Sequence, residues 1–181
     1  MAASQPDSFA QAGEMGIGVL CFNIGNPEEL RSRVARYHEG LERAKPVGKF
    51  INKHIAALGV VYCGESDKEA RETAGEAGMW FLNKTLELYQ PWRAEQMKVP
   101  DSYRYAVQAV QQERTGKTVE DHIEGGTFCI GDPDTCVRII KKYEEVGIDQ
   151  VLCFMQFGRL PHQKIMESIK RMGKYVIPYF L

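Results

Sequence analysis

Two short segments of the sequence carry residue types that can bind an anion or shape a ligand pocket. The first is Ser4-Gln5-Pro6-Asp7-Ser8, where Pro6 fits the first turn of a helix that begins near Ser4 or Gln5. A helix start presents free N–H groups and a partial positive charge, so Ser4, Gln5 and Ser8 can donate hydrogen bonds to a phosphate there. Alternatively, Ser4 and Ser8 only cap the helix, as many serines do. Asp7 adds a negative charge beside the proposed anion.

The second segment is Gln156-Phe157-Gly158, which follows the apolar run 149–155. If that run is a strand of a parallel sheet, the segment lies at the carboxyl end of the strand, where α/β proteins bind ligands. Gly158 permits a tight approach of two backbones or a positive φ angle. An ordinary strand-to-helix turn explains the same three residues equally well.

The histidines and the remaining acids give weaker indications of chemistry, and no catalytic side chain is assigned. Three histidines are expected to be structural or exposed: His38, His54 and His162. His122 falls in an irregular segment and is a candidate for the border of a substrate channel. Its neighbours Asp121 and Glu124 do not complete a metal site, because the cluster lacks a second histidine.

Composition and charge exclude several classes of partner. The 181 residues are 44% hydrophobic, and 23 Lys and Arg against 24 Asp and Glu leave a net charge of -1. This balance predicts binding neither to nucleic acid nor to an anionic membrane. The N-terminal residues lack a basic start and an apolar run, which favours a cytoplasmic protein. The five cysteines show no CxxC spacing and are expected to be reduced structural thiols.

Three continuously apolar runs predict strands, over residues 16–22, 56–63 and 149–155. Runs that are apolar on both faces are typical of parallel sheets, whose strands are buried on both sides. The opening Ala2-Ala3-Ser4 is interpreted as the carboxyl end of another strand.

Helical periodicity separates these runs. Helices are predicted from Asn26-Pro27 to Leu41, from a capping box at Ser66–Glu69 to about Tyr89, from Asp132-Pro133 to Gly147, and from Pro161 to near Pro178. Strands that alternate with amphipathic helices predict parallel βαβ units with right-handed crossovers.

The number of strands indicates an incomplete domain. Three strands and a remnant are too few to close a parallel barrel, which needs eight, and an open sheet of this size leaves its edges unpaired. The chain is therefore expected to begin in mid-domain and to form one partial domain over residues 1–181. Residues 90–126, which include Tyr103 and Tyr105, interrupt the alternation and are predicted to be an insertion or lid-like segment.

Three segments of the chain resemble one known family. These are AASQPDSFAQAGEMGIGVL, KPVGKFINKHIAALGVVYCGESDKEARE and the long run GDPDTCVRIIKKYEEVGIDQVLCFMQFGRLPHQKIMESIKRMGKYVIPYF. They resemble the bacterial-luciferase-like flavin-dependent monooxygenases over most of the chain apart from residues 90–126. The third segment is the most specific, because its motifs occur together in one order.

The resemblance implies an α/β fold, the C-terminal half of a (β/α)8 TIM barrel from the end of strand five to helix eight, with an insertion before the last βα unit. It also implies that Ser4, Gln5 and Ser8 help to bind the flavin phosphate. The turn Gln156, Phe157 and Gly158 would shape the cofactor and substrate end of the barrel. The family's catalytic histidine and phosphate-binding arginine belong to the N-terminal half.

The function implied is the oxidation of a small organic substrate by reduced FMN and O2, with a flavin reductase as a further partner and no activity from this part alone. Some members of the family use a deazaflavin coenzyme for hydride transfer instead. The alternative hypothesis is a non-catalytic flavin-binding or half-barrel protein that forms a homodimer to cover its strand edges.

Overall fold

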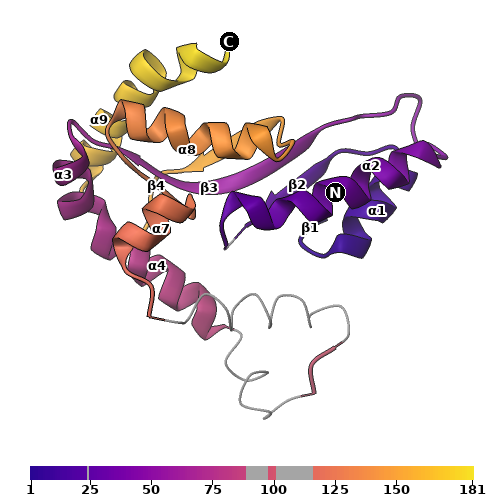
Figure 1. Ribbon diagram of the computed structural model, residues 1–181, viewed down its shortest axis with the longest axis horizontal. Helices are drawn as coiled ribbons and strands as arrows, with labels where there is room; N and C mark the ends of the chain where they lie inside the picture. The colour runs from indigo at the N-terminus through magenta and orange to yellow at the C-terminus, as the bar shows by residue number, and fades with distance from the viewer. Residues whose placement is uncertain (24, 89–97, 101–115) are drawn as a thin grey trace.

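The computed structural model describes residues 1–23, 25–88, 98–100 and 116–181 (Figure 1). Within these residues five strands form one parallel sheet: β1 (Ala2–Ala3), β2 (Val19–Phe22), β3 (Ile55–Cys63), β4 (Phe128–Gly131) and β5 (Gln150–Phe154). The order is β1-β2-β3-β4, and β5 also pairs with β3. The predicted parallel α/β fold is therefore confirmed, whereas β4 was not predicted because its four residues make too short an apolar run.

The register shows which strands form a continuous wall. β2 pairs with residues 55–58 of β3, and β5 pairs with residues 56–60. Because these stretches overlap, β2 and β5 lie on opposite sides of β3, so β1, β2, β3 and β5 follow one another in the wall. β4 pairs only with the last residues of β3, from Val60 to Cys63.

Helices separate the strands much as the periodicity predicts. They are α1 (Pro6–Glu14), the 3-10 turn η1 (Pro27–Leu30), α2 (Arg31–Glu42), α3 (Asp67–Ala70), the π turn η2 (Arg71–Gly75), α4 (Glu76–Glu87), α7 (Val119–Gly125), α8 (Pro133–Glu145), α9 (His162–Arg171), the π turn η4 (Met172–Val176) and the 3-10 turn η5 (Ile177–Phe180). Figure 1 shows α1 and α2 beside the start of β3, and α3 and α9 near its end. None of the helices in the described ranges is long and apolar enough to cross a bilayer.

Two details of the helices differ from prediction. The helix predicted to stop near Pro178 continues through it, because a 3-10 turn accommodates proline near its start. The segment 90–126 was expected to be irregular, but its end folds as α7 behind a capping box of Thr118 and Asp121. The rest of the predicted insertion, including Trp92, Tyr103 and Tyr105, lies outside the described residues.

The two faces of the wall are covered very differently. On the outer face Cys21, Ala57 and Val61 are fully buried under the helices. On the inner face Leu20 is 46% exposed and Phe22 is 39% exposed. The prediction that strands are buried on both sides is thus wrong for β2, because its inner face stays partly open even where Phe81 of α4 packs against Phe22. An open apolar inner face is the expected surface of one wall of a barrel.

Candidate functional site

The start of α1 is one end of the candidate site. The helix begins as predicted, with Gln5 as the N-cap and Pro6 in the first turn, and no side chain caps it. The hypothesis that Ser4 and Ser8 merely cap the helix is therefore wrong. The backbone N–H groups of Asp7 and Ser8 lie in the first turn, which has no acceptors within a helix. Together with the exposed Ser4, they can bind an anion.

Close packing of two helices fixes the position of α1. A Cβ atom at Gly40 of α2 would lie 2.2 Å from the carbonyl oxygen of Ala10, and one at Gly13 would lie 2.2 Å from that of Tyr37. The two glycines therefore allow the backbones of α1 and α2 to touch. The Tyr37 hydroxyl also donates to the carbonyl oxygens of Ile17 at 3.1 Å and of Asn52 at 2.8 Å. Contacts of backbone with backbone leave α1 little freedom to move.

The charges at this end are compatible with a bound phosphate. The Asp7 side chain is almost fully exposed, so water screens its charge from an anion beside the helix start. Its carboxylate also lies 3.9 Å from the guanidinium of Arg36, which reduces the net negative charge. Because the free backbone N–H groups at the start of α1 face the position proposed for the anion, the residues there fit a phosphate group.

The turn after β5 is the other end of the candidate site. Gly158 has a φ of +57°, and a Cβ atom there would lie 2.9 Å from the Cβ of Ala77 in α4. Both properties predicted for this glycine, the positive φ and the close approach, are confirmed. Phe157 is buried and only 3% exposed, so its ring anchors the turn, whereas Gln156 is exposed. Gln156 is therefore the side chain of the turn that can reach a ligand.

The start of α1 and the turn after β5 both lie at the carboxyl edge of one sheet. They do not touch, because β2 and β3 lie between β1 and β5. An apolar hollow of about 340 Å³ lies on the inner face beside Ser4. Its lining comes from four strands, β1, β2, β3 and β5, and includes Leu20, Phe22, Leu58 and Leu152. These residues were not predicted, although the spacing of two between Leu20 and Phe22 places them on a common face of β2.

An aromatic row crosses the inner face from β2 to the turn. Phe81 of α4 packs edge-on against Phe22 with ring centroids 6.5 Å apart, and against Phe154 at 5.0 Å. Phe154 then contacts the ring of Phe157 at 6.0 Å. Phe81 is thus a packing aromatic, and the row connects the hollow to the turn that carries Gln156.

The four histidines differ in their surroundings. His162 and His38 are exposed, and a ring nitrogen of His54 lies 3.2 Å from the Gln150 amide oxygen. His122 is buried in α7, with its ring 4.9 Å from that of Phe128. The hypothesis that His122 borders a channel stays a prediction, and its burial gives no support to it. Among the residues that the structure describes, no group of three or more His, Cys, Asp or Glu side chains is placed to hold a metal.

The fold and the position of both candidate segments define the class of protein. A parallel β/α sheet whose ligand-binding candidates follow the carboxyl ends of its strands is the arrangement of β/α barrels. The chain belongs to the luciferase-like monooxygenase family, whose family model matches residues 1–150. This match confirms the resemblance drawn from the sequence motifs.

Solved structures show the same fold over the whole chain. Monooxygenase RslO1 from Streptomyces bottropensis is 18% identical, with a TM-score of 0.70 over 99% of this chain and 47% of its own. The oxygenating constituent of 3,6-diketocamphane monooxygenase from Pseudomonas putida, a type II Baeyer–Villiger monooxygenase in complex with FMN, is 20% identical, with a TM-score of 0.68 over 99% of this chain and 48% of its own. The coenzyme F420 dependent tetrahydromethanopterin reductase from Methanopyrus kandleri is 23% identical, with a TM-score of 0.63 over 100% of this chain and 50% of its own.

These similarities concern the fold, because the identities are low. The chain spans about half the length of each of the three relatives. Four strands in the wall are half of the eight in a closed barrel, so the structure agrees with the predicted partial barrel.

Proposed function

We propose that this chain forms the carboxyl-terminal wall of a flavin-dependent monooxygenase that oxidises an organic substrate with reduced FMN and O2. The observation that carries the proposal is the uncapped start of α1, which lies on the same sheet edge as the exposed apolar hollow. A helix start suits the phosphate of a flavin, and an apolar surface suits its ring or an organic substrate.

Each candidate residue has a defined task in this proposal. The N–H groups of Asp7 and Ser8, with the side chains of Ser4, Gln5 and Ser8, hold the phosphate. Gln156 provides a polar contact at the far end of the edge, and Phe157 and Gly158 fix its position. When bound, reduced FMN supplies the chemistry by activating oxygen, while the apolar inner face excludes water from the reaction. A separate flavin reductase in the cytoplasm would supply the reduced cofactor.

The opposite wall must provide the remaining groups, so this chain alone is expected to be inactive. The chain covers about half of its structural relatives, and the inner face of β2 is open. The proposal therefore places the catalytic side chains on the part of the barrel that faces Leu20 and Phe22. A deazaflavin used for hydride transfer is the second cofactor consistent with the same phosphate site, because one of the similar structures is an F420-dependent reductase.

A flavin titration tests the proposal directly. Purified protein that also carries the four preceding strands is titrated with FMN and, separately, with F420, and binding is followed by the quenching of flavin fluorescence. Stoichiometric FMN binding, followed by substrate-dependent oxygen uptake when the flavin is reduced, is the expected result. Tight binding of F420 without FMN binding would replace the monooxygenase with a hydride-transfer enzyme, and binding of neither would refute a flavin site.

A second candidate function is a non-catalytic homodimer of half barrels. The exposed Leu20 and Phe22 favour it, together with the outer edges of β1 and β5, which pair with no strand of the described chain. In such a dimer β5 of each copy would meet β1 of the other, and the two inner faces would bury each other. Size-exclusion chromatography of this chain with FMN separates the two candidates, because a stable dimer without flavin absorbance supports only the scaffold.

A further inference from the structure

The turn that carries Gln156 has weak bonding of its own. The hydrogen bond from the N–H of Leu160 to the carbonyl of Phe157 is long, at 3.5 Å. The backbone of Gly158 rests on Ala77 of α4, and α9 begins at His162 directly after the turn. The position of the turn must therefore come from α4 before it in the chain and α9 behind it.

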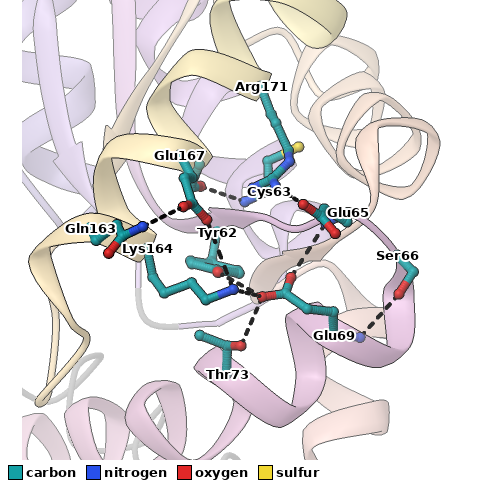
Figure 2. Close-up of polar contacts among 11 residues, drawn as sticks. Tyr62, Cys63, Glu65, Ser66, Glu69, Thr73, Gln163, Lys164, Glu167 and Arg171 are labelled. Atoms are coloured by element: carbon teal, nitrogen blue, oxygen red, sulfur yellow. Dashed lines mark hydrogen bonds and ion pairs between the residues drawn. The ribbon is translucent and has the colours of Figure 1, made fainter.

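One carboxylate joins these elements (Figure 2). Oε1 of Glu69, in α3, accepts hydrogen bonds from the ammonium of Lys164 at 2.9 Å, the hydroxyl of Thr73 at 3.0 Å and the hydroxyl of Tyr62 at 3.2 Å. Oε2 accepts from the backbone N–H of Glu65 at 3.3 Å. Glu69 thus connects the end of β3, the α3 and η2 turns, and the first turn of α9.

This use of Glu69 departs from the predicted capping box. Ser66 caps α3 by accepting from the N–H of Glu69 at 3.2 Å, as expected. The carboxylate of Glu69, however, accepts from the N–H of Glu65 and not from that of Ser66. Its other oxygen is free to receive donors from distant parts of the chain. Burial opposes ionisation, but the hydrogen bonds from Lys164 and Thr73 outweigh it and hold the pKa of Glu69 below its ordinary value.

A hollow lies beside the turn and next to these contacts. The hollow has a volume of about 470 Å³, and its lining includes Thr73, Ala77 and Trp80 on one side and Gly158 and Arg159 on the other. Thr73 therefore both donates to Glu69 and lines the hollow. Along the chain α3, η2 and α4 are continuous, so Glu69 and Ala77 belong to one helical rod. The rod contacts the chain at Gly158, the last residue of the turn, and again at Lys164 in the first turn of α9, so it holds the turn from its C-terminal side.

We propose that Glu69 is a positioning residue, which through Lys164 holds the Gln156–Gly158 turn against α4. The geometry of the turn follows from these contacts alone, and its consequence for a cofactor rests on the proposed function. Sites held by supporting hydrogen bonds lose affinity when the support is removed, because the contact groups move away from the ligand.

Limited proteolysis with trypsin tests this inference without a ligand. Arg159 is exposed and directly follows Gly158, so a loosened turn is cleaved after Arg159. Two variants, Glu69→Gln and Lys164→Met, remove the same ion pair from opposite sides. The control is Glu65→Gln, which breaks the 2.7 Å ion pair between Glu65 and Arg171 at the far end of α9. Cleavage after Lys141, exposed on α8, reports general unfolding in every sample.

The expected result is that cleavage after Arg159 becomes about tenfold faster than cleavage after Lys141 in both variants of the pair, but not in the control. The double variant should resemble the single ones, because they break one interaction. An equal rise at both cleavage sites, or the same rise in Glu65→Gln, overturns the inference by showing only a general role in stability.

A titration with FMN separates this inference from the proposed function. In the protein that carries the preceding strands, Glu69→Gln should raise the dissociation constant of FMN about tenfold. If wild-type protein binds no FMN while the turn loosens as expected, the flavin function fails and the positioning role stands. If FMN binds equally well to wild type and variant while cleavage is unchanged, the positioning role fails and the flavin function stands.

Discussion

The start of α1 and the turn after β5 lie at the same edge of the sheet, yet different contacts hold them. Gly13 and Gly40 let the backbones of α1 and α2 touch, so neighbouring segments of the chain fix α1. The turn depends on the ring of Phe157, the contact of Gly158 with Ala77 and an ion pair of α9. The contacts of Gly158 with Ala77 and of Lys164 with Glu69 join residues about 80 to 95 positions apart in the sequence.

This difference suggests how each end can respond to a ligand. Backbone contacts between helices are rigid, so the α1 end is suited to hold a phosphate in a fixed place. Side-chain contacts can break and reform, so the β5 end is the part of the edge that can adjust to the rest of a ligand. The predictions below test this contrast.

The largest effect is expected from Phe157→Ala, which empties the buried anchor of the β5 end. Removing a buried phenyl ring should lower the free energy of unfolding by about 3 kcal/mol. Urea denaturation measures the change. Phe50, which is 83% exposed, gives the matched control, and Phe50→Ala should change stability by less than about 0.5 kcal/mol. Equal effects from both variants would contradict the anchoring role of Phe157.

Gly40→Ala tests the rigid end. The added methyl group would collide with the carbonyl of Ala10, so the free energy of unfolding should fall by about 2 kcal/mol, despite the better helix propensity of alanine. Gly48→Ala is the control, because a Cβ atom there meets nothing within 4 Å. Calorimetry that finds Gly40→Ala as stable as wild type would show that α1 and α2 can move apart at little cost in free energy.

Ser8→Ala tests the phosphate assignment at the same end. Loss of one hydrogen bond to a charged phosphate should raise the dissociation constant of FMN at least about tenfold, in protein that carries the preceding strands. Ser32→Ala, at an exposed position of α2, should leave FMN affinity unchanged. An unaltered affinity in Ser8→Ala removes that side chain from the site.

The smallest effect concerns the pH dependence of stability at the β5 end. The folded-state pKa of Glu69 is lower than its ordinary value, so its contribution is present above the unfolded-state pKa of about 4.3 and is lost as pH falls through the folded-state pKa. Between pH 7 and pH 3, wild type should lose up to about 1 kcal/mol more stability than Glu69→Gln. Parallel stability curves from urea denaturation would show that the carboxylate is not stabilised by folding.

The sequence predicted the regular elements well where their residues follow a period. The apolar runs of β3 and β5 and the helices α2 and α8 were found within a few residues. The short β4 and α7 were missed. Four residues in β4 and seven in α7 are too few to show the hydrophobic periodicity of a strand or a helix. The site was predicted in part: both segments lie at the expected edge, but the lining residues Leu58 and Leu152 were not identified.

The sequence by itself determined the alternation of the longer strands and helices, the start of α1 at Gln5 and Pro6, and the suitability of glycine at Gly158. These features depend on contacts between near neighbours and on backbone geometry, which local residue types specify. Only the tertiary structure decided that Glu69 supports α9 instead of completing its capping box, and that Leu20 and Phe22 remain exposed. Both depend on which distant segments of the chain come into contact. The residue type of a carboxylate or an apolar side chain does not specify which distant residue it will contact.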